Sequence, residues 1–269
     1  MRRFENKVAI ITGSSQGIGK ALAHAFVREG SFVVLNGRNA ERLKKVEEEF
    51  KEIGATVLTV TGDVSDEKQA QTIVDKTIER FGRIDFVINN AGISMRGDFS
   101  DLNPRVFKSI FETNLFGVTN LSIPALPYLK RTKGSLVFIS SLAGITGLPG
   151  LSAYCSSKMA LRAIAESIRI EENKSGMHVG LIQVGFTEIE PNKQTMGADG
   201  ELILIKDRTQ FKVQTKEYVA NAVLMNIKNR KFITTLSGIG KLQVLLKSYA
   251  PRLLEKIISR SSEKIKSRS

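Results

Sequence analysis

The sequence has few cysteines and histidines. Its single cysteine, Cys155, cannot form an internal disulfide, which fits a reducing compartment, and we expect a packed small residue rather than a nucleophile. The two histidines, His24 and His178, lie within a helical and a strand pattern, where a packed or solvated role is expected. No group of cysteines and histidines has the spacing of metal ligands, so the sequence predicts no metal site.

Segments that would direct the chain into or across a membrane are also missing. No window of about 18 uncharged apolar residues is present, which argues against a spanning helix. The amino-terminal residues run directly into a glycine-rich motif, without the apolar region and cleavage site of a signal peptide. We therefore expect a cytoplasmic protein, either free or attached peripherally to a membrane.

What is present suits one large α/β domain. A chain of 269 residues that is 42% hydrophobic and 25% charged can bury one sizeable core. Short runs typical of strands lie at Val8–Thr12, Phe32–Asn36, Val57–Thr61, Phe86–Asn89, Ser135–Ser140, His178–Val184 and Phe232–Thr235. Helical patterns separate them, at Gly17–Arg28, Glu41–Ile53, Glu67–Phe81, Arg105–Leu129, Ala153–Asn173 and Lys216–Lys228. Several strands are apolar throughout, so helices are expected on both faces of a parallel sheet. The sequence thus predicts a doubly wound α/β domain, or Rossmann fold, over residues 1–237.

One long segment breaks this alternation. Glu188–Thr215 has few periodic positions and contains Gly197 and Gly200, so we expect an irregular insertion. It follows the sixth predicted strand, and ligands of doubly wound sheets bind at the carboxyl ends of strands. The segment is therefore expected to be a lid over the substrate.

A glycine-rich turn follows the first predicted strand and leads into a helical pattern. Its residues are Gly13, Ser14, Ser15, Gln16, Gly17, Ile18 and Gly19. Glycines at such a turn let the backbone approach a pyrophosphate, and the N–H groups at the start of the helix bind that anion. The strand-to-helix context makes the turn a candidate dinucleotide site.

The end of the second predicted strand indicates which dinucleotide binds. An acidic residue about 20 residues past the first glycine would bind the 2′-hydroxyl of NAD, but the chain there has no acid and carries Arg38. Arg38 can meet a 2′-phosphate through a charge-assisted contact, so NADP is favoured over NAD. Gln16, which is uncharged, adds no second basic contact. After the third strand, Asp63, followed by Val64, is either an acceptor for the adenine amino group or a turn residue.

Tyr154 and Lys158 lie four residues apart at the start of a long helical pattern, so they share one helix face. A tyrosine whose pKa is near 10 is a poor acid or base at neutral pH, and an adjacent cation stabilises its phenolate. This spacing is common, and it becomes informative through the motifs that accompany it.

Together these motifs resemble the ordered signature of the short-chain dehydrogenase/reductase family. The matching residues are Thr12, Gly13, Gly17, Gly19, Asn89, Asn90, Ala91, Gly92, Asn114, Ser141, Tyr154 and Lys158. Their order and spacing both agree, and the resemblance extends from about residue 5 to residue 235.

The resemblance implies a role for each member of a catalytic tetrad. Tyr154 would be the acid in reduction and the base in oxidation, and Lys158 would bind the nicotinamide ribose and lower the tyrosine pKa. Ser141, with Ser140 as the neighbouring alternative, would hydrogen-bond the substrate oxygen. Asn114 would hold a water that relays protons to the lysine. The chemistry is consistent, because reduction turns a carbonyl into an oxyanion that needs donors and then a proton.

Further cofactor contacts follow from the same resemblance. The residues that it places beside the cofactor are Asn90, Ala91 and Gly92, although the asparagines have an equally strong role in bracing the central sheet. One departure follows the sixth strand, where Ile189 occupies the place of the usual threonine. Thr187 is the candidate substitute for the nicotinamide contact.

The last part of the chain is strongly basic. The formal net charge is +13, and residues 238–269 hold eight lysines and arginines against two glutamates. Leu253, Leu254, Ile257 and Ile258 share one face of a helical pattern, so a basic amphipathic extension is expected there. It can dock on its own protein or lie on an anionic membrane. Nucleic acid is the weakest candidate, because neither stacking aromatics nor a nucleic-acid motif accompanies the charge.

Within the family, three features resemble the reductases of lipophilic ketones, such as 3-ketodihydrosphingosine reductase and 11β-hydroxysteroid dehydrogenase relatives. They are the insert 97–102, the run 147–151 and the basic extension. With the NADP preference that Arg38 indicates, we expect NADP(H)-dependent interconversion of a lipophilic ketone and a secondary alcohol. We also expect a homodimer or homotetramer. The residues that either line the substrate pocket or belong to the core are Met95, Leu148, Leu151, Phe186 and Leu202–Ile205.

Two other functions stay open. The basic surface would also suit a reductase of 3-oxoacyl groups on an acyl-carrier protein, since such carriers are acidic. A non-enzymatic nucleotide-sensing or membrane scaffold protein is the alternative from another class, and the intact tetrad argues against it.

Overall fold

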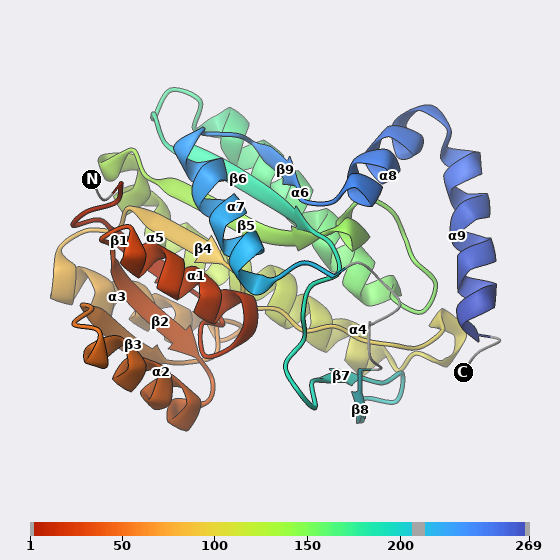
Figure 1. Cartoon of the computed structure of the whole chain (residues 1–269), viewed down its shortest axis with the longest axis horizontal. Coiled ribbons are helices and arrows are strands. Elements are labelled where there is room, and N and C mark those ends of the chain that lie inside the picture. The colour runs from red at the N-terminus through yellow and green to blue at the C-terminus, as the bar shows by residue number, and fades with distance from the viewer. Residues whose placement is uncertain (1–2, 206–212, 267–269) are drawn as a thin grey trace.

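The computed structural model describes residues 3–205 and 213–266, with side chains as far as Ser261. Its centre is a sheet of seven parallel strands in the order β3-β2-β1-β4-β5-β6-β9 (Figure 1). The strands are β1 (Val8–Ile11), β2 (Phe32–Gly37), β3 (Val57–Thr61), β4 (Phe86–Asn89), β5 (Ser135–Ser141), β6 (His178–Val184) and β9 (Ile233–Thr235). Each predicted strand is present within one residue of its expected ends. The doubly wound α/β fold is therefore confirmed.

Helices cover both faces of the sheet. One face carries α1 (Gly17–Arg28), α2 (Ala40–Glu52) and α7 (Lys216–Lys228), and the other carries α3 (Glu67–Phe81), α5 (Gly117–Thr132) and α6 (Ser152–Glu171). Alternate side chains of β1 enter the two apolar clusters, Ile11 on the first face and Ile10 on the second. Burial on both faces explains why these strands are apolar throughout.

The expected continuous helix over Arg105–Leu129 is wrong in one respect. α4 (Pro104–Phe111) leads into a π-helical turn over Glu112–Phe116, and α5 continues from there. Turns of this kind are rare and occur frequently at functional sites. This one carries Asn114, and the helical sequence pattern runs through it without a visible break.

The expectation of an irregular Glu188–Thr215 segment is wrong in part. β7 (Gln194–Met196) and β8 (Leu202–Leu204) form an antiparallel hairpin. The Arg96 N–H donates to the Met196 carbonyl at 2.8 Å, and the Met196 N–H donates to the Ser94 carbonyl at 3.2 Å. These bonds fasten the hairpin to the chain that follows β4, beside the carboxyl end of the sheet. Residues 206–212 of the expected lid lie outside the described residues.

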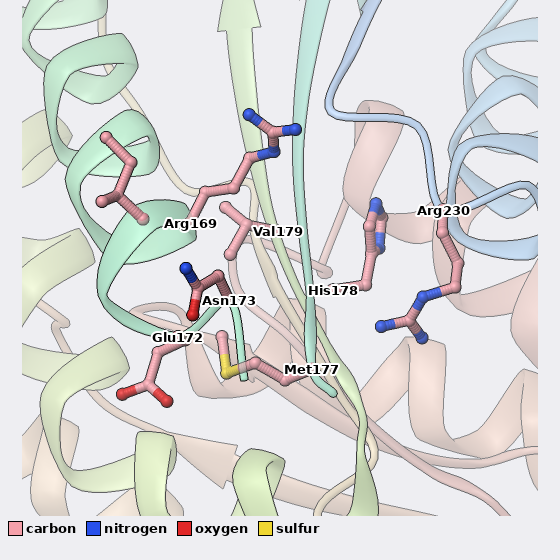
Figure 2. A pocket seen from close by; sticks show the side chains of 8 residues that line it. Arg169, Glu172, Asn173, Met177, His178, Val179 and Arg230 are labelled. Carbon is pink, nitrogen blue, oxygen red and sulfur yellow. The ribbon is translucent and has the colours of Figure 1, made fainter. Parts of the chain in front are cut away.

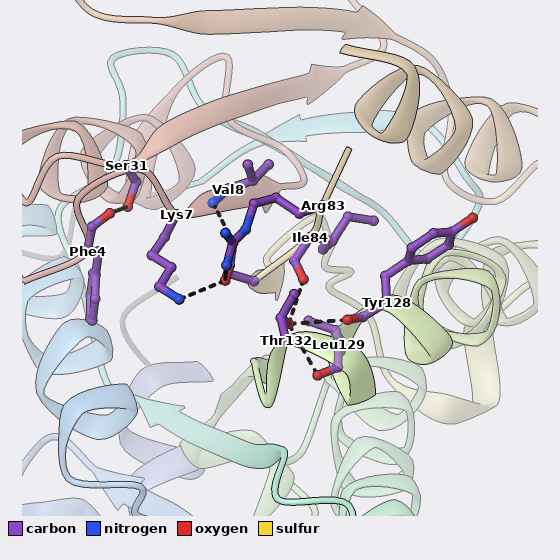
Figure 3. A network of polar contacts seen from close by, with 10 residues as sticks. Phe4, Lys7, Val8, Ser31, Arg83, Ile84, Tyr128, Leu129 and Thr132 are labelled. Atoms are coloured by element: carbon purple, nitrogen blue, oxygen red, sulfur yellow. Dashed lines mark hydrogen bonds and ion pairs between the residues drawn. The ribbon is translucent and has the colours of Figure 1, made fainter. Parts of the chain in front are cut away.

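A buried carboxylate joins two strands at the opposite, amino-terminal end of the sheet. Asp85 immediately precedes β4, and its side chain accepts a 3.0 Å hydrogen bond from the Val8 N–H. Arg83 donates to both carboxylate oxygens, at 2.7 and 2.8 Å, and Lys7 Nζ lies 3.2 Å from Oδ1 (Figure 3). Asp85 thus connects the start of β1 to the start of β4.

The predicted extension consists of α8 (Gly238–Tyr249) and α9 (Pro251–Lys266), which lie at the edge of the molecule beyond β9 (Figure 1). Gln243 Nε2 on α8 donates to the Leu142 carbonyl at 3.2 Å, and Leu142 follows Ser141 directly. The extension therefore reaches the neighbourhood of the expected catalytic serine. No described helix is both long and apolar enough to cross a membrane.

Candidate active site

The expected site residues gather at the carboxyl ends of the central strands. β1 and β4 are neighbours from which the strand order runs outward in opposite directions, which is the position where doubly wound sheets bind ligands. The glycine-rich turn follows β1, and Asn90, Ala91 and Gly92 follow β4. Ser141 ends β5, and Thr187 follows β6.

The glycine-rich turn has the backbone that the sequence predicts. Gly13 and Gly17 have φ angles of 62° and 59°, a left-handed region that favours glycine. A Cβ on Gly19 would clash with the Gly13 carbonyl, so α1 can approach the strand this closely only with glycine at that position. Ser15 and Ile18 lie half-buried in the same turn, and Gln16 is exposed.

The asparagine motif after β4 braces the turn. Thr12 Oγ1 accepts hydrogen bonds from the N–H groups of Asn90 and Ala91, at 3.0 and 2.9 Å. Asn90 Nδ2 in turn donates to the Thr12 carbonyl at 2.8 Å, and Asn89 Nδ2 donates to Ser122 Oγ at 3.0 Å. The structure therefore supports the bracing role of both asparagines.

The end of β2 carries a basic cluster. Arg38 is 64% exposed and lies 3.5 Å from Asp63, whose other oxygen accepts from the Ser65 N–H and hydroxyl at 2.9 and 2.7 Å. Burial of Asp63 opposes its charge, but the hydrogen bonds from Ser65 and the Arg38 guanidinium outweigh it and lower the pKa of the carboxyl. The bonds from Ser65 suit the turn role of Asp63, and an adenine contact stays a prediction. Val64 packs against Gly117 of α5.

A second guanidinium, which the sequence reasoning missed, contacts the glycine-rich turn. Arg42 Nη1 donates to Gln16 Oε1 at 3.1 Å, so the glycine-rich turn does border a cation through its glutamine. Arg42 lies four residues after Arg38, at the start of α2, and this spacing was the available signal. The two arginines give the site the donors that a 2′-phosphate needs.

Tyr154 and Lys158 share a face of α6, as expected. Lys158 Nζ lies 5.9 Å from the centroid of the Tyr154 ring and donates to the Ile139 carbonyl at 3.0 Å. The lysine is only 5% exposed, and burial lowers its pKa to about 8. A buried ammonium beside a phenol is the arrangement that stabilises a phenolate.

The π-helical turn brings Asn114 to the same place. Its Oδ1 accepts from the Ile93 N–H at 2.8 Å, and its Nδ2 donates to the Ile93 carbonyl at 2.9 Å and to Ser157 Oγ at 3.1 Å. A Cβ on Gly92 would lie 3.1 Å from Asn114 Oδ1 and 3.3 Å from Lys158 Nζ. Gly92, Asn114 and Lys158 therefore converge, and the water relay through Asn114 stays a prediction.

The two neighbouring serines at the end of β5 have different surroundings. Ser140 is buried, and its hydroxyl donates to the Lys158 carbonyl at 3.2 Å. Ser141 is half-buried, and its Oγ accepts from the Ala143 N–H at 3.2 Å, which leaves its proton available for another acceptor. The geometry therefore favours Ser141 over Ser140 as the donor to a substrate oxygen.

The loop after β6 contacts the glycine-rich turn through Glu190, which the sequence analysis did not single out. Thr187 is buried, and its hydroxyl donates to the Gly185 carbonyl at 3.3 Å, so its nicotinamide contact stays a prediction. Glu190 Oε1 instead accepts from the Gly17 N–H at 3.1 Å and from Lys216 Nζ at 2.7 Å. No pattern in the sequence indicates this contact, because its partners are far apart along the chain.

The expected pocket residues divide between core and surface. Met95 is wholly buried and belongs to an apolar cluster with Ala153 of α6, so it is a core residue. Leu148 and Leu151, which precede Tyr154 in the sequence, are half-buried. Phe186 and the side chains of β8 are exposed. The exposed members lie on the loop and hairpin expected to cover the substrate.

The remaining titratable candidates lie outside this site. Burial raises the pKa of the Cys155 thiol, which disfavours the nucleophilic thiolate. His24 packs on Phe50, with ring centroids 4.5 Å apart. His178 is buried at the start of β6, beside a surface hollow that Arg169 and Arg230 also line (Figure 2). The hollow is at the amino-terminal end of the strand and contains none of the tetrad.

The residues present fit a dinucleotide. The left-handed glycines, the N–H groups at the start of α1 and the two arginines match a pyrophosphate and a 2′-phosphate. Among the described side chains, no three of His, Cys, Asp and Glu lie where they could hold a metal ion.

Comparison with known proteins agrees with this geometry. Residues 7–199 match the short chain dehydrogenase family. The Bos taurus protein called dehydrogenase/reductase SDR family member 7B is 33% identical, over 98% of this chain and 84% of its own length. The 11-beta-hydroxysteroid dehydrogenase 1A of Arabidopsis thaliana is 34% identical, over 93% of this chain and 73% of its own.

Solved structures show the same architecture with different cofactors. An alcohol dehydrogenase from the archaeon Thermococcus sibiricus, complexed with 5-hydroxy-NADP, has a TM-score of 0.75 at 28% identity and covers 86% of this chain and 95% of its own. A short chain dehydrogenase/reductase from Burkholderia phymatum in complex with NAD has a TM-score of 0.82 at 22% identity, over 94% and 96%, and it shows the fold alone. The chain therefore belongs to the short-chain dehydrogenase/reductase family.

Proposed function

We propose that this oxidoreductase interconverts a carbonyl group and a secondary alcohol with NADP(H), and that it reduces a lipophilic ketone. The observation that carries the proposal is the buried Lys158 ammonium beside the Tyr154 phenol, at the sheet end that also carries the glycine-rich turn. This arrangement suits proton transfer at an oxygen rather than a scaffold role.

Four side chains of the protein have separate roles in the reduction. The Ser141 hydroxyl donates to the substrate oxygen, and the Tyr154 hydroxyl donates a second hydrogen bond and then its proton. The Lys158 ammonium stabilises the phenolate left behind. Asn114 holds the chain after β4 against α6 and so positions the lysine. The bound nicotinamide would supply the hydride in reduction and accept it in oxidation.

Cofactor preference is expected to depend on Arg38. NADPH should bind at least about tenfold more tightly than NADH, because Arg38 and Arg42 can pair with a 2′-phosphate and no carboxylate ends β2. Arg38→Ala should remove most of that preference, measured by calorimetric titration of both cofactors. Arg80→Ala, which removes an exposed charge on α3, is the control. Equal dissociation constants in the unmutated protein would refute the NADP assignment.

The proposed lipophilic substrate is supported by apolar side chains that are exposed on the carboxy-terminal extension and on β8. Exposed large side chains follow one another along the two helices of the extension and on β8. They are Ile239, Leu242, Leu245, Tyr249, Leu253, Ile257, Leu202 and Leu204. Of the expected apolar stripe on α9, Leu254 is buried while Leu253 and Ile257 are about half exposed. The extension thus contacts the domain at Leu142 and still exposes apolar side chains.

We infer that the carboxy-terminal extension lies on an anionic membrane. Residues 238–269 hold eight basic against two acidic side chains, and each basic residue near an anionic surface contributes about 1 kcal/mol. The full chain is expected to float with anionic liposomes at low salt and to dissociate as salt rises. A chain ending at Ser237 should stay with the lipid-free fraction. Leu242→Ser combined with Leu245→Ser tests the apolar part without truncation or a change of charge, and it should float less. The inference fails if the full chain and the truncated chain both stay with the lipid-free fraction at low salt, or if all three proteins float equally.

An assay with two classes of substrate separates the competing functions. Consumption of NADPH is followed with free lipid ketones and with the same acyl chains bound to an acyl-carrier protein. Turnover only with carrier-bound substrates would favour the 3-oxoacyl reductase. Cofactor binding without turnover of any ketone would favour the scaffold. The expected homodimer or homotetramer stays a prediction.

A further inference from the structure

The first residue of α1 donates a hydrogen bond to a carboxylate that is far away in the sequence. The Gly17 N–H donates to Glu190 Oε1 at 3.1 Å, and Lys216 Nζ donates to the same oxygen at 2.7 Å. Gly17 opens α1, Lys216 opens α7, and the two helices pack against each other on one face of the sheet (Figure 1). Glu190 therefore connects the loop after β6 to both helix starts.

The chemistry of this contact is that of an anion site. α1 has no acidic residue in its first turn, and its N-cap residue Gln16 makes no side-chain capping bond. A carboxylate is favoured at such a helix start, and so is a phosphate. The hydrogen bond from Lys216 is the largest influence on Glu190 and lowers the pKa of its carboxyl, so it is charged at neutral pH.

The Gly17 N–H also belongs to the turn that faces a dinucleotide pyrophosphate. Two anions at one helix start repel each other and compete for the same donor. Glu190 is only partly exposed, with 34% of its side chain accessible, so water screens this repulsion incompletely. A pyrophosphate approaching the turn must displace the carboxylate or bind against its charge.

We propose that Glu190 is a latch that occupies the pyrophosphate position at Gly17 and is displaced when the cofactor binds. The inference rests on the proposed NADP(H) function and adds a residue that sets cofactor affinity. Displacement frees Lys216, whose ammonium then faces the incoming phosphate. The closed latch lowers the fraction of protein competent to bind, and the apparent Kd rises by the same factor.

Removing the charge of Glu190 tests the latch. Glu190→Gln is expected to tighten NADPH binding by about two- to tenfold, since glutamine keeps the shape but loses the repulsion, and Glu190→Ala should do the same. Glu188→Gln removes a neighbouring exposed carboxylate of the same loop and should leave the Kd unchanged. Unchanged or weaker binding by both Glu190 variants, with normal binding by the unmutated protein, would overturn the latch and leave the proposed function intact.

A second measurement uses the unmutated protein. A carbodiimide that joins touching carboxylate and amine groups should link Glu190 to Lys216 in the free protein, and saturating NADPH should suppress the link. The pair Lys20 and Glu49, 2.7 Å apart between α1 and α2, is the matched control whose link should not change. Mass spectrometry of the peptides measures both. An equal Glu190–Lys216 link with and without cofactor means that the carboxylate stays in place and contradicts the latch. Failure to bind either NADPH or NADH would instead reject the proposed function, and the latch with it.

Discussion

Replacing Tyr154 by phenylalanine is expected to lower turnover by about two to four orders of magnitude while the Kd for NADPH changes by less than about twofold. In the proposed mechanism the hydroxyl is needed at the substrate oxygen, whereas the proposed phosphate contacts are in the glycine-rich turn and at Arg38 and Arg42. Steady-state rates and calorimetric titration separate the two effects. Tyr128→Phe removes a hydroxyl from α5, away from the tetrad, and is the control.

The pH profile supplies a further readout on the same pair. Burial lowers the pKa of Lys158 to about 8, so the lysine loses its proton as the pH rises through that value. A neutral lysine cannot stabilise a phenolate, and kcat/KM for reduction should therefore fall above about pH 8. For the Tyr154→Phe variant, turnover equal to that of the unmutated protein would show that the tyrosine does not transfer the proton.

Sequence patterns predict well the features that are determined by residues adjacent in the sequence. The seven strands are short apolar runs between turn residues, and burial on both faces makes such runs easy to place. Three members of the tetrad are recognisable because Ser141 ends a strand and Tyr154 and Lys158 share one helix face. Gly13 and Gly17 were predictable for the same reason, since the left-handed backbone at these positions favours glycine.

What the sequence did not reveal depends on long-range packing. The π-helical turn at Asn114 interrupts a pattern that is helical in composition on both sides. The hairpin β7–β8 is held by bonds to residues that follow β4, about a hundred positions earlier in the chain. Glu190 reaches Gly17 across the sheet, and no periodicity connects them. In each case the partner that decides the local structure lies in another element.

The two ends of the sheet carry different groups, so function and stability should be separable by mutation. The proposed tetrad and the proposed dinucleotide turn lie at the carboxyl ends of the strands. The amino-terminal end carries the buried Asp85 and its partners from β1 and the chain before β4 (Figure 3). A substitution at Asp85 should therefore change folding without touching the reacting groups.

Asp85→Ala is expected to lower the free energy of unfolding by about 2–4 kcal/mol. The change leaves the buried Val8 N–H without its acceptor and removes the partner of two cations, although Lys7 and Arg83 are about 40% exposed and can regain water. Denaturant unfolding measures the loss. Glu166→Ala breaks an ion pair with Arg162 of the same 2.7 Å length, but both side chains are nearly half exposed, so it should cost about 0.3–0.5 kcal/mol. Similar costs for the two variants would show that burial does not set the strength of the Asp85 contacts, and a lower turnover per folded molecule would show that the two ends of the sheet are coupled.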